Sequence, residues 1–138
     1  REFLFLSKKD FSTSLERIFK LEESTSEITK PIHLKFEVVK ERTTQNRQTI
    51  YVDKDALAFP LKLRKWQNGD FFYPSGMKGK KKLSKYFKDE KLSLIEKQNT
   101  WLLCNNNNDI IWVIGYRQDN QFLTNTFSKT IIKISLNS

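Results

Sequence analysis

Two short apolar runs near the end of the chain constrain its fold more than any other feature of the sequence. They are "WLLC" at 101–104 and "IIWVIG" at 110–115. Apolar runs of this length, bounded by turn residues, are typical of strands that are covered on both faces. The asparagine-rich segment between them favours turns, so it predicts a hairpin loop.

Further strands are predicted by alternation. In "IHLKFEVV" at 32–39, every second residue is apolar, which places one apolar face on a strand. Shorter segments that favour strands lie at 2–6, 49–52, 61–66 and 130–136, and a turn or short helix is expected at 53–57.

The segment 14–23 is ambiguous. Thr13 and Glu16 form a capping-box pattern, and Leu15 and Phe19 have helical spacing. Leu15 and Phe19 also fall on one face of a strand, and a turn-rich stretch separates them from the next alternating segment. We favour a hairpin in which 14–23 pairs with that segment.

Two short helices are expected after a loop rich in glycine and proline. In "KKLSKYFKDE" at 81–90, Leu83, Tyr86 and Phe87 form an apolar stripe, while lysines occupy another face. Ser93 and Glu96 form a capping-box pattern that predicts a second helix at 94–99. The expected fold class is α+β: a compact, mostly antiparallel, sandwich-like β core with two short helices after the loop.

The charge of the chain is strongly positive and local. The formal net charge is +9 over 138 residues, and six lysines lie between positions 78 and 88 with no acid among them. A solvated helix face usually mixes acids with bases, because like charges one turn apart weaken a helix by a few tenths of a kcal/mol per pair. An anionic partner would screen that repulsion, so this cluster favours anion binding.

The candidate site follows from this cluster. Gly69, Pro74, Gly76 and Gly79 are expected to shape the loop, because glycine lets the backbone bend and approach a ligand closely. The candidate phosphate contacts are Arg64, Lys78, Lys80, Lys81, Lys82, Ser84, Lys85, Lys88 and Arg117.

Several other functions are excluded or disfavoured. The glycine spacing fits neither a Walker A loop nor a dinucleotide-binding loop. "GMKG" at 76–79 matches the loop of KH domains, but the residues before it do not favour the helix that this fold requires. A membrane-surface helix would need large apolar residues projecting beside its lysines, whereas these aromatics are needed for the core. No apolar run is long enough to span a bilayer.

No catalytic or metal-binding constellation is visible in the sequence. Cys104 is the only cysteine and His33 the only histidine, so neither a disulfide nor a Cys/His metal site is expected. A reducing, cytoplasmic location fits this cysteine use. Because the chain begins with Arg1, we expect a piece of a larger protein whose chemistry lies elsewhere.

The region 60–122 resembles the C-terminal domain of bacterial tRNA(Ile)-lysidine synthetase. The resemblance depends on three motifs, namely L-R-x-W at 63–66, G-D-x-F-x-P-x-G-M-x-G-x-K-K-L-S at 69–84 and W-V-x-G-x-R at 112–117. Gln121 departs from the pattern, since relatives often carry arginine there, and this weakens the case for an extended basic strip.

The resemblance implies a function divided between two parts of a longer protein. It implies an N-terminal domain that uses ATP, with magnesium, and lysine to convert the wobble cytidine of an isoleucine tRNA to lysidine. This chain would carry no catalytic site or cofactor and would dock the tRNA near its acceptor stem. A related fold is expected in the phenylalanyl-tRNA synthetase β-subunit.

The expected organisation is a β-rich lead-in segment at 1–59 that packs on a tRNA-binding domain at 60–138. The expected partners are the tRNA, the chain's own N-terminal catalytic domain and a second copy of the chain in a homodimer. The alternative is a protein-interaction or dimerisation module whose lysines stay solvated.

Overall fold

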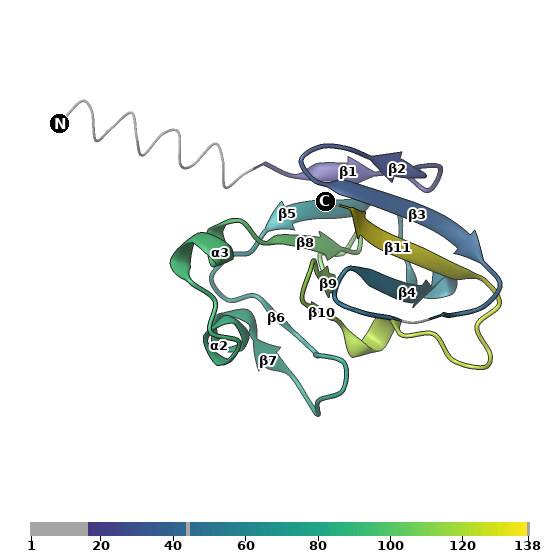
Figure 1. Ribbon diagram of the computed structural model, residues 1–138. Helices are drawn as coiled ribbons and strands as arrows, with labels where there is room; N and C mark the ends of the chain where they lie inside the picture. Colours follow the sequence, from purple (N-terminus) through teal and green to yellow (C-terminus); the bar gives the residue numbers. More distant parts are fainter. Residues whose placement is uncertain (1–16, 44, 138) are drawn as a thin grey trace.

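The computed structural model describes residues 17–43 and 45–137 of the chain, which form two larger antiparallel sheets, a two-stranded sheet and two short helices (Figure 1). The first sheet has the strand order β1-β5-β8-β9-β10. Its strands are β1 (Phe19–Leu21), β5 (Leu61–Lys65), β8 (Trp101–Cys104), β9 (Ile110–Val113) and β10 (Arg117–Gln118).

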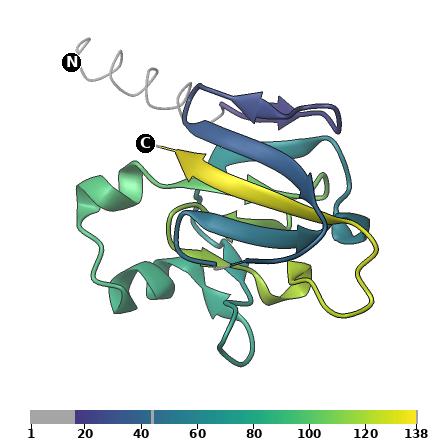
Figure 2. The ribbon, with the colours of Figure 1, turned by 45° about the vertical axis from the view of Figure 1, so that its right-hand side comes forward.

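The second sheet has the order β2-β3-β11-β4 and packs across the first, as the turned view shows (Figure 2). Its strands are β2 (Glu27–Ile28), β3 (His33–Val39), β11 (Ile131–Asn137) and β4 (Thr49–Asp53). Every strand pairing in both sheets is antiparallel.

The remaining elements lie outside the two sheets. A small antiparallel pair, β6 (Phe71–Phe72) and β7 (Lys81–Lys82), leads directly into helix α2 (Leu83–Asp89), which helix α3 (Leu94–Gln98) follows. Two 3-10 turns, η1 (Lys54–Ala56) and η2 (Asn120–Phe122), complete the described chain. None of the helices in the described ranges is both long and apolar enough to cross a membrane.

The first sheet is covered on both faces, as the apolar runs predict. On one face, Leu103 and Trp112 pack against the second sheet in the main core. On the other face, Leu102 and Val113 pack beneath α2 in a second core cluster. Residues 102–104 of β8 enter the two cores alternately, whereas in β9 the two end residues enter one core and the two middle residues the other, across an irregularity in the pairing. Both strands therefore supply both cores, which explains why they are apolar throughout.

Helix α2 is held by its apolar stripe. Leu83, Tyr86 and Phe87 are almost fully buried, and the Phe87 ring meets Trp66 edge-on with 5.3 Å between ring centroids. The predicted inward stripe is confirmed. The helix begins at Leu83, because Lys81 and Lys82 pair with β6 as a strand. The second helix has the predicted capping box between Ser93 and Glu96.

The predicted hairpin between 14–23 and 32–39 is wrong. Residues 19–21 do form a strand, but β1 pairs with β5 in the first sheet, while β3 pairs with β2 and β11 in the second. Phe19 meets Trp101 edge-on with 5.8 Å between ring centroids, and this contact stabilises β1 at the edge of the first sheet. The capping-box pattern at residues 13–16 and the strand predicted at 2–6 lie outside the described residues.

The mostly antiparallel α+β fold is confirmed, and both sheets combine early and late parts of the sequence. Strand β11 lies between β3 and β4, so residues before and after position 60 share one sheet. Strand β1 likewise joins the first sheet through β5. The division of the chain at residue 60 stays a prediction.

Candidate nucleic-acid interface

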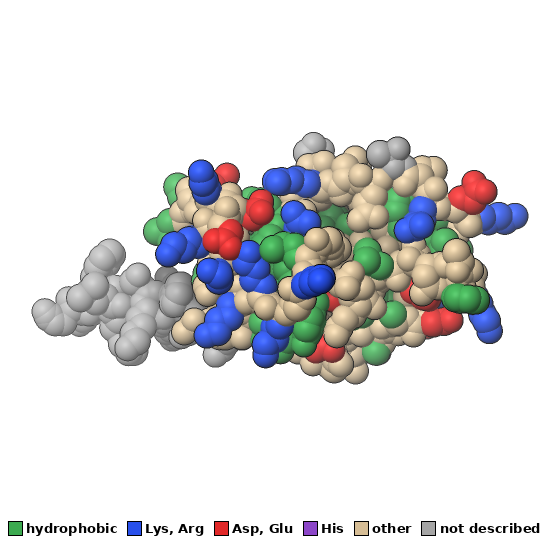
Figure 3. All heavy atoms as spheres, turned by 90° about the horizontal axis from the view of Figure 1, so that it is seen from below, with side chains coloured by type: hydrophobic (Ala, Val, Ile, Leu, Met, Phe, Trp, Pro, Cys, Tyr) green, Lys and Arg blue, Asp and Glu red, His purple; other side chains and the backbone are tan. Residues whose placement is uncertain are grey.

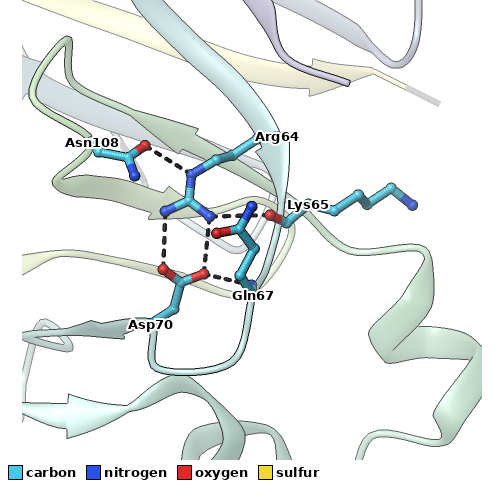
Figure 4. Close-up of polar contacts among 5 residues, drawn as sticks. All are labelled: Arg64, Lys65, Gln67, Asp70 and Asn108. Carbon is cyan, nitrogen blue, oxygen red and sulfur yellow. Dashed lines mark hydrogen bonds and ion pairs between the residues drawn. The ribbon is translucent and has the colours of Figure 1, made fainter. Parts of the chain in front are cut away.

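A buried ion pair fixes the start of the glycine- and proline-rich loop. The Arg64 guanidinium donates to both carboxylate oxygens of Asp70 at 2.9 and 3.0 Å (Figure 4). Its Nε also donates to Asn108, at 2.9 Å. Asp70 in turn accepts from the backbone N–H of Gln67 at 2.7 Å, which closes the turn around the Asn-Gly pair.

This geometry corrects the assignment of Arg64 to the phosphate-binding surface. Only 2% of Arg64 is exposed, and its donors are used by Asp70, Asn108 and the Lys65 carbonyl. Burial acts to lower the pKa of Arg64, but Asp70 and the nearby Cys104 together outweigh it, and the pKa is raised. Arg64 therefore orients the loop from beneath instead of contacting a ligand.

The middle of the loop is held against β10 and η2. Tyr73 N–H donates to the Asp119 carboxylate at 2.9 Å, and Ser75 N–H donates to the Gln118 carbonyl at 2.9 Å. Pro74 forms an isolated bridge with Asp119 and is buried. Because both flanks of the loop are fixed, the segment that carries the lysines has a defined position.

The predicted loop-shaping glycines act through their backbone conformation. Gly76 and Gly79 have φ angles of +80° and +77°, a region that residues with a Cβ rarely adopt. A Cβ at Gly79 would meet nothing within 4 Å, so crowding inside the protein does not require glycine there. The requirement is the left-handed turn that sends the chain back into β7.

The loop and α2 together enclose a hollow of about 360 Å³, here called the lysine hollow. Pro74 and Met77 supply its apolar lining. Its remaining lining residues are Lys78, Lys80, Lys81, Lys82 and Lys85. Seen from below, basic side chains gather at the end of the molecule that contains α2 and the β6–β7 pair (Figure 3).

Most of these lysines form no ion pair within the described residues. Lys81 forms an ion pair with Asp89 at 2.6 Å, and hydrogen bonding from Lys81 is the main reason that the pKa of Asp89 is lowered. Lys80 lies 4.4 Å from the centre of the Phe71 ring. Within residues 17–43 and 45–137, no carboxylate lies within 4.0 Å of the other predicted lysines, which are Lys78, Lys80, Lys82, Lys85 and Lys88.

The other predicted contacts lie around the lysine hollow without lining it. Lys88 and Ser84 are exposed on α2. Arg117 lies on the far side of the 74–77 turn, where its guanidinium donates to the Ser75 carbonyl at 2.9 Å. The structure thus brings five of the nine predicted residues together in one hollow.

Two contributions were missed at the sequence level. Met77 lines the hollow, although its motif position gave no sign of this. Arg47, from the polar loop before β4, pairs with Glu90 at the end of α2 at 3.5 Å and lies 6.0 Å from the centre of the Tyr116 ring. The contacts of Arg47 join residues more than forty positions apart, so they leave no local signal in the sequence. The buried pair of Arg64 and Asp70 spans only six positions, and this short spacing could have suggested it.

The described residues offer little for catalysis. Among them, no group of three or more His, Cys, Asp or Glu side chains is placed to hold a metal ion. Cys104 is fully buried, and this burial raises the pKa of its thiol to about 11. His33 is paired with Glu27 on the second sheet, and neither residue lines the lysine hollow.

The fold and this surface define a small α+β domain with one strongly basic end. The family model described as "TilS substrate C-terminal domain" matches residues 61–135. A solved structure titled "Crystal structure of TILS C-terminal domain" superposes with a TM-score of 0.75 at 20% identity, covering 88% of this chain and 98% of that one. The chain belongs to the TilS substrate C-terminal domain family.

Curated relatives agree with this assignment. The tRNA(Ile)-lysidine synthase of Parabacteroides distasonis is 43% identical over an alignment of 131 positions, which covers 89% of this chain. The enzyme of the same name from Bacteroides thetaiotaomicron is 42% identical over 66% of the chain. The chain spans only 30% of the first relative and 21% of the second. The resemblance drawn from the sequence motifs is confirmed.

Proposed function

We propose that this chain is the tRNA-docking domain of a tRNA(Ile)-lysidine synthase, and that the lysine hollow contacts the phosphate backbone of the tRNA. The observation that carries the proposal is the hollow itself: five lysines line it, and only Lys81 has a carboxylate partner among the described residues. Lysines that neutralise phosphates release condensed counterions, which is the main source of nucleic-acid affinity that is independent of sequence.

The proposed parent enzyme converts the wobble cytidine of an isoleucine tRNA to lysidine, using ATP with magnesium and lysine in an N-terminal catalytic domain. That domain is the first expected protein partner of this chain, and dimerisation and a cytoplasmic location stay predictions. Phosphate contacts fix position and register but carry no sequence information. We therefore propose that docking near the acceptor stem positions the tRNA. Selection of one tRNA over others requires further contacts.

Binding of the isolated chain to a fluorescently labelled isoleucine tRNA tests the proposal, with anisotropy measured between 50 and 200 mM salt. If four lysines each neutralise one phosphate, the affinity should fall about 100-fold over this range. The double variant K82E/K85E should lower the slope of log affinity against log salt by about two.

The matched control is K40E/K129E, which makes the same change in net charge at two exposed loop lysines. Lys40 directly follows β3 and Lys129 precedes β11, at the end of the second sheet where Val39 pairs with Ile131. This end of the sheet lies away from α2 (Figure 1). We expect this variant to keep most of the wild-type affinity. Equal losses in the two variants would show that net charge alone acts, and would refute a defined docking site.

A protein-contact surface is the second candidate function, and one observation favours it. Leu94 and Ile95 on α3 are 66% and 67% exposed. Large apolar side chains that lie side by side on a surface often mark a site of contact with another protein. If L94S/I95S abolished association with the catalytic domain while K82E/K85E left tRNA affinity unchanged, this chain would be an interaction module with solvated lysines.

A further inference from the structure

A second hollow lies beside the lysine hollow, across the 74–77 turn. It measures about 320 Å³ and is lined by residues 45–47 of the loop before β4, by Ile50, by Ser75, and by Trp112 and residues 116–118. We call it the arginine hollow, after Arg47 and Arg117, which both line it. Pro74 lines the lysine hollow and Ser75 the arginine hollow, so a single turn separates them.

The acceptor groups around the arginine hollow are largely used within the protein. The Gln118 side chain accepts from Gln45 at 3.3 Å and donates to the Tyr51 and Phe122 carbonyls at 3.0 and 3.3 Å. The Ser75 carbonyl accepts from Arg117 at 2.9 Å. These contacts leave few free acceptors for a ligand that brings donors.

Two buried donor atoms, in contrast, are left without partners. Among the described residues, neither the indole Nε1 of Trp112 nor the Nε of Arg117 has a hydrogen-bond partner, although both atoms are buried. Trp112 is fully buried and lines the hollow. A buried donor without an acceptor is costly. Because both atoms are covered, an acceptor-rich ligand in the hollow would satisfy them only if side chains beside them shifted to let its oxygens approach.

The charge of the hollow points the same way. Within the described ranges, Arg117 has no carboxylate within 4.0 Å, whereas Arg47 has one, Glu90, at 3.5 Å. The Arg47 guanidinium also lies 6.0 Å from the centre of the Tyr116 ring. An anion with several acceptor oxygens matches two guanidinium groups and an indole N–H better than a neutral ligand does.

We propose that the arginine hollow binds a phosphate group, contributed by the RNA that docks on the lysine hollow. The inference rests on the proposed function for the source of the phosphate, but its chemistry depends only on the donors of this hollow. A strand that crosses the 74–77 turn would place phosphates in both hollows. A phosphate bound in the arginine hollow would fix the position of the RNA on this surface. The lysines attract the RNA backbone but do not fix its position to the same degree.

The indole N–H resonance of Trp112 reports on the hollow directly. The chain has three tryptophans, and loss of one peak in Trp112→Phe assigns the resonance in a proton–nitrogen NMR spectrum. Inorganic phosphate, titrated at constant ionic strength, should shift the Trp112 peak with saturation and leave those of Trp66 and Trp101 in place. A short RNA hairpin with a base-paired stem should shift the same peak.

Variants make the assignment specific. Arg117→Gln should weaken the phosphate response at least fivefold, and Lys129→Gln, which removes one charge from an exposed loop, should leave it unchanged. Because Arg117 also supports the 74–77 turn, Arg47→Gln gives a second test at a side chain that is 60% exposed. We expect this variant to weaken the response as well.

The outcomes separate this proposal from the proposed function. RNA binding that depends on salt but leaves the Trp112 peak and the Arg47 and Arg117 variants unaffected would overturn the arginine hollow and leave the lysine hollow intact. A saturable phosphate response without any RNA binding would support the hollow with free phosphate as its source, and would overturn tRNA docking. A Trp112 peak that neither probe moves would show that phosphate does not bind beside these donors, and would refute the proposal.

Discussion

The ion pair between Arg64 and Asp70 should be the most sensitive polar contact in the domain. We consider the substitution Asp70→Asn, which keeps the shape of the side chain and removes its charge. The Arg64 side chain is 3% exposed and that of Asp70 is 15% exposed. Removing one partner of a buried ion pair leaves the other charge uncompensated and typically costs 3–5 kcal/mol.

We expect a cost near the lower end of that range, about 3 kcal/mol, because an asparagine oxygen still accepts one hydrogen bond from the guanidinium. An unfolding entropy of ~2.1 cal/mol/K per residue converts this, for a chain of this length, to a fall in Tm of about 10 °C. Urea denaturation followed by tryptophan fluorescence measures the free energy, and a thermal melt measures Tm.

The matched control is Asp55→Asn, which makes the same chemical change at an exposed aspartate in η1 and should cost less than about 0.5 kcal/mol. A double-mutant cycle with Arg64→Met isolates the pair, because Asp70→Asn should cost far less once the guanidinium is absent. Two results would show that the ion pair does not fix the loop. One is that Asp70→Asn lowers the free energy of unfolding no more than the control does, and the other is that it lowers it equally in the wild-type and Arg64→Met chains.

Three further predictions concern the cores and the loop. Phe87→Ala should destabilise the domain by about 3–5 kcal/mol and expose α2 to proteolysis, because it empties the core cluster beneath that helix; Phe127→Ala, at a site 88% exposed, is the control. Gly79→Ala should cost about 1–2 kcal/mol in urea denaturation because of its positive φ, and a neutral effect would contradict that conformation. The Cys104 thiol, with its pKa raised to about 11 by burial, should react with Ellman's reagent at pH 8 only after unfolding. Native stability should also fall between pH 9 and 11, because the unfolded thiol ionises first; rapid labelling of the native chain would contradict the burial.

The sequence predicts the strands of the central sheet well, because burial leaves a strong local pattern. The unbroken apolar runs of β8 and β9 required cover on both faces, and two separate cores supply it. The stripe of Leu83, Tyr86 and Phe87 likewise predicted which side of α2 is buried. Short elements such as β6, β7 and β10 were missed, because two residues carry no readable period.

Pairing and charge placement were harder to predict. The strand at 19–21 was expected to pair with the next strand along the chain, but contact with Trp101 places it in the other sheet. Arg64 looked like another member of a basic surface, and only its distance to Asp70 shows that it is structural. Charged residues have no periodic signature that distinguishes a buried pair from a solvated side chain.

The docking role of the lysine hollow can be measured lysine by lysine. Reductive methylation of the chain with and without isoleucine tRNA, read by mass spectrometry, reports which amines the RNA covers. We expect strong protection of Lys78, Lys80, Lys82 and Lys85, and none of Lys40 or Lys129. Uniform labelling in the presence of saturating tRNA, or protection confined to lysines outside α2 and its preceding loop, would contradict the account.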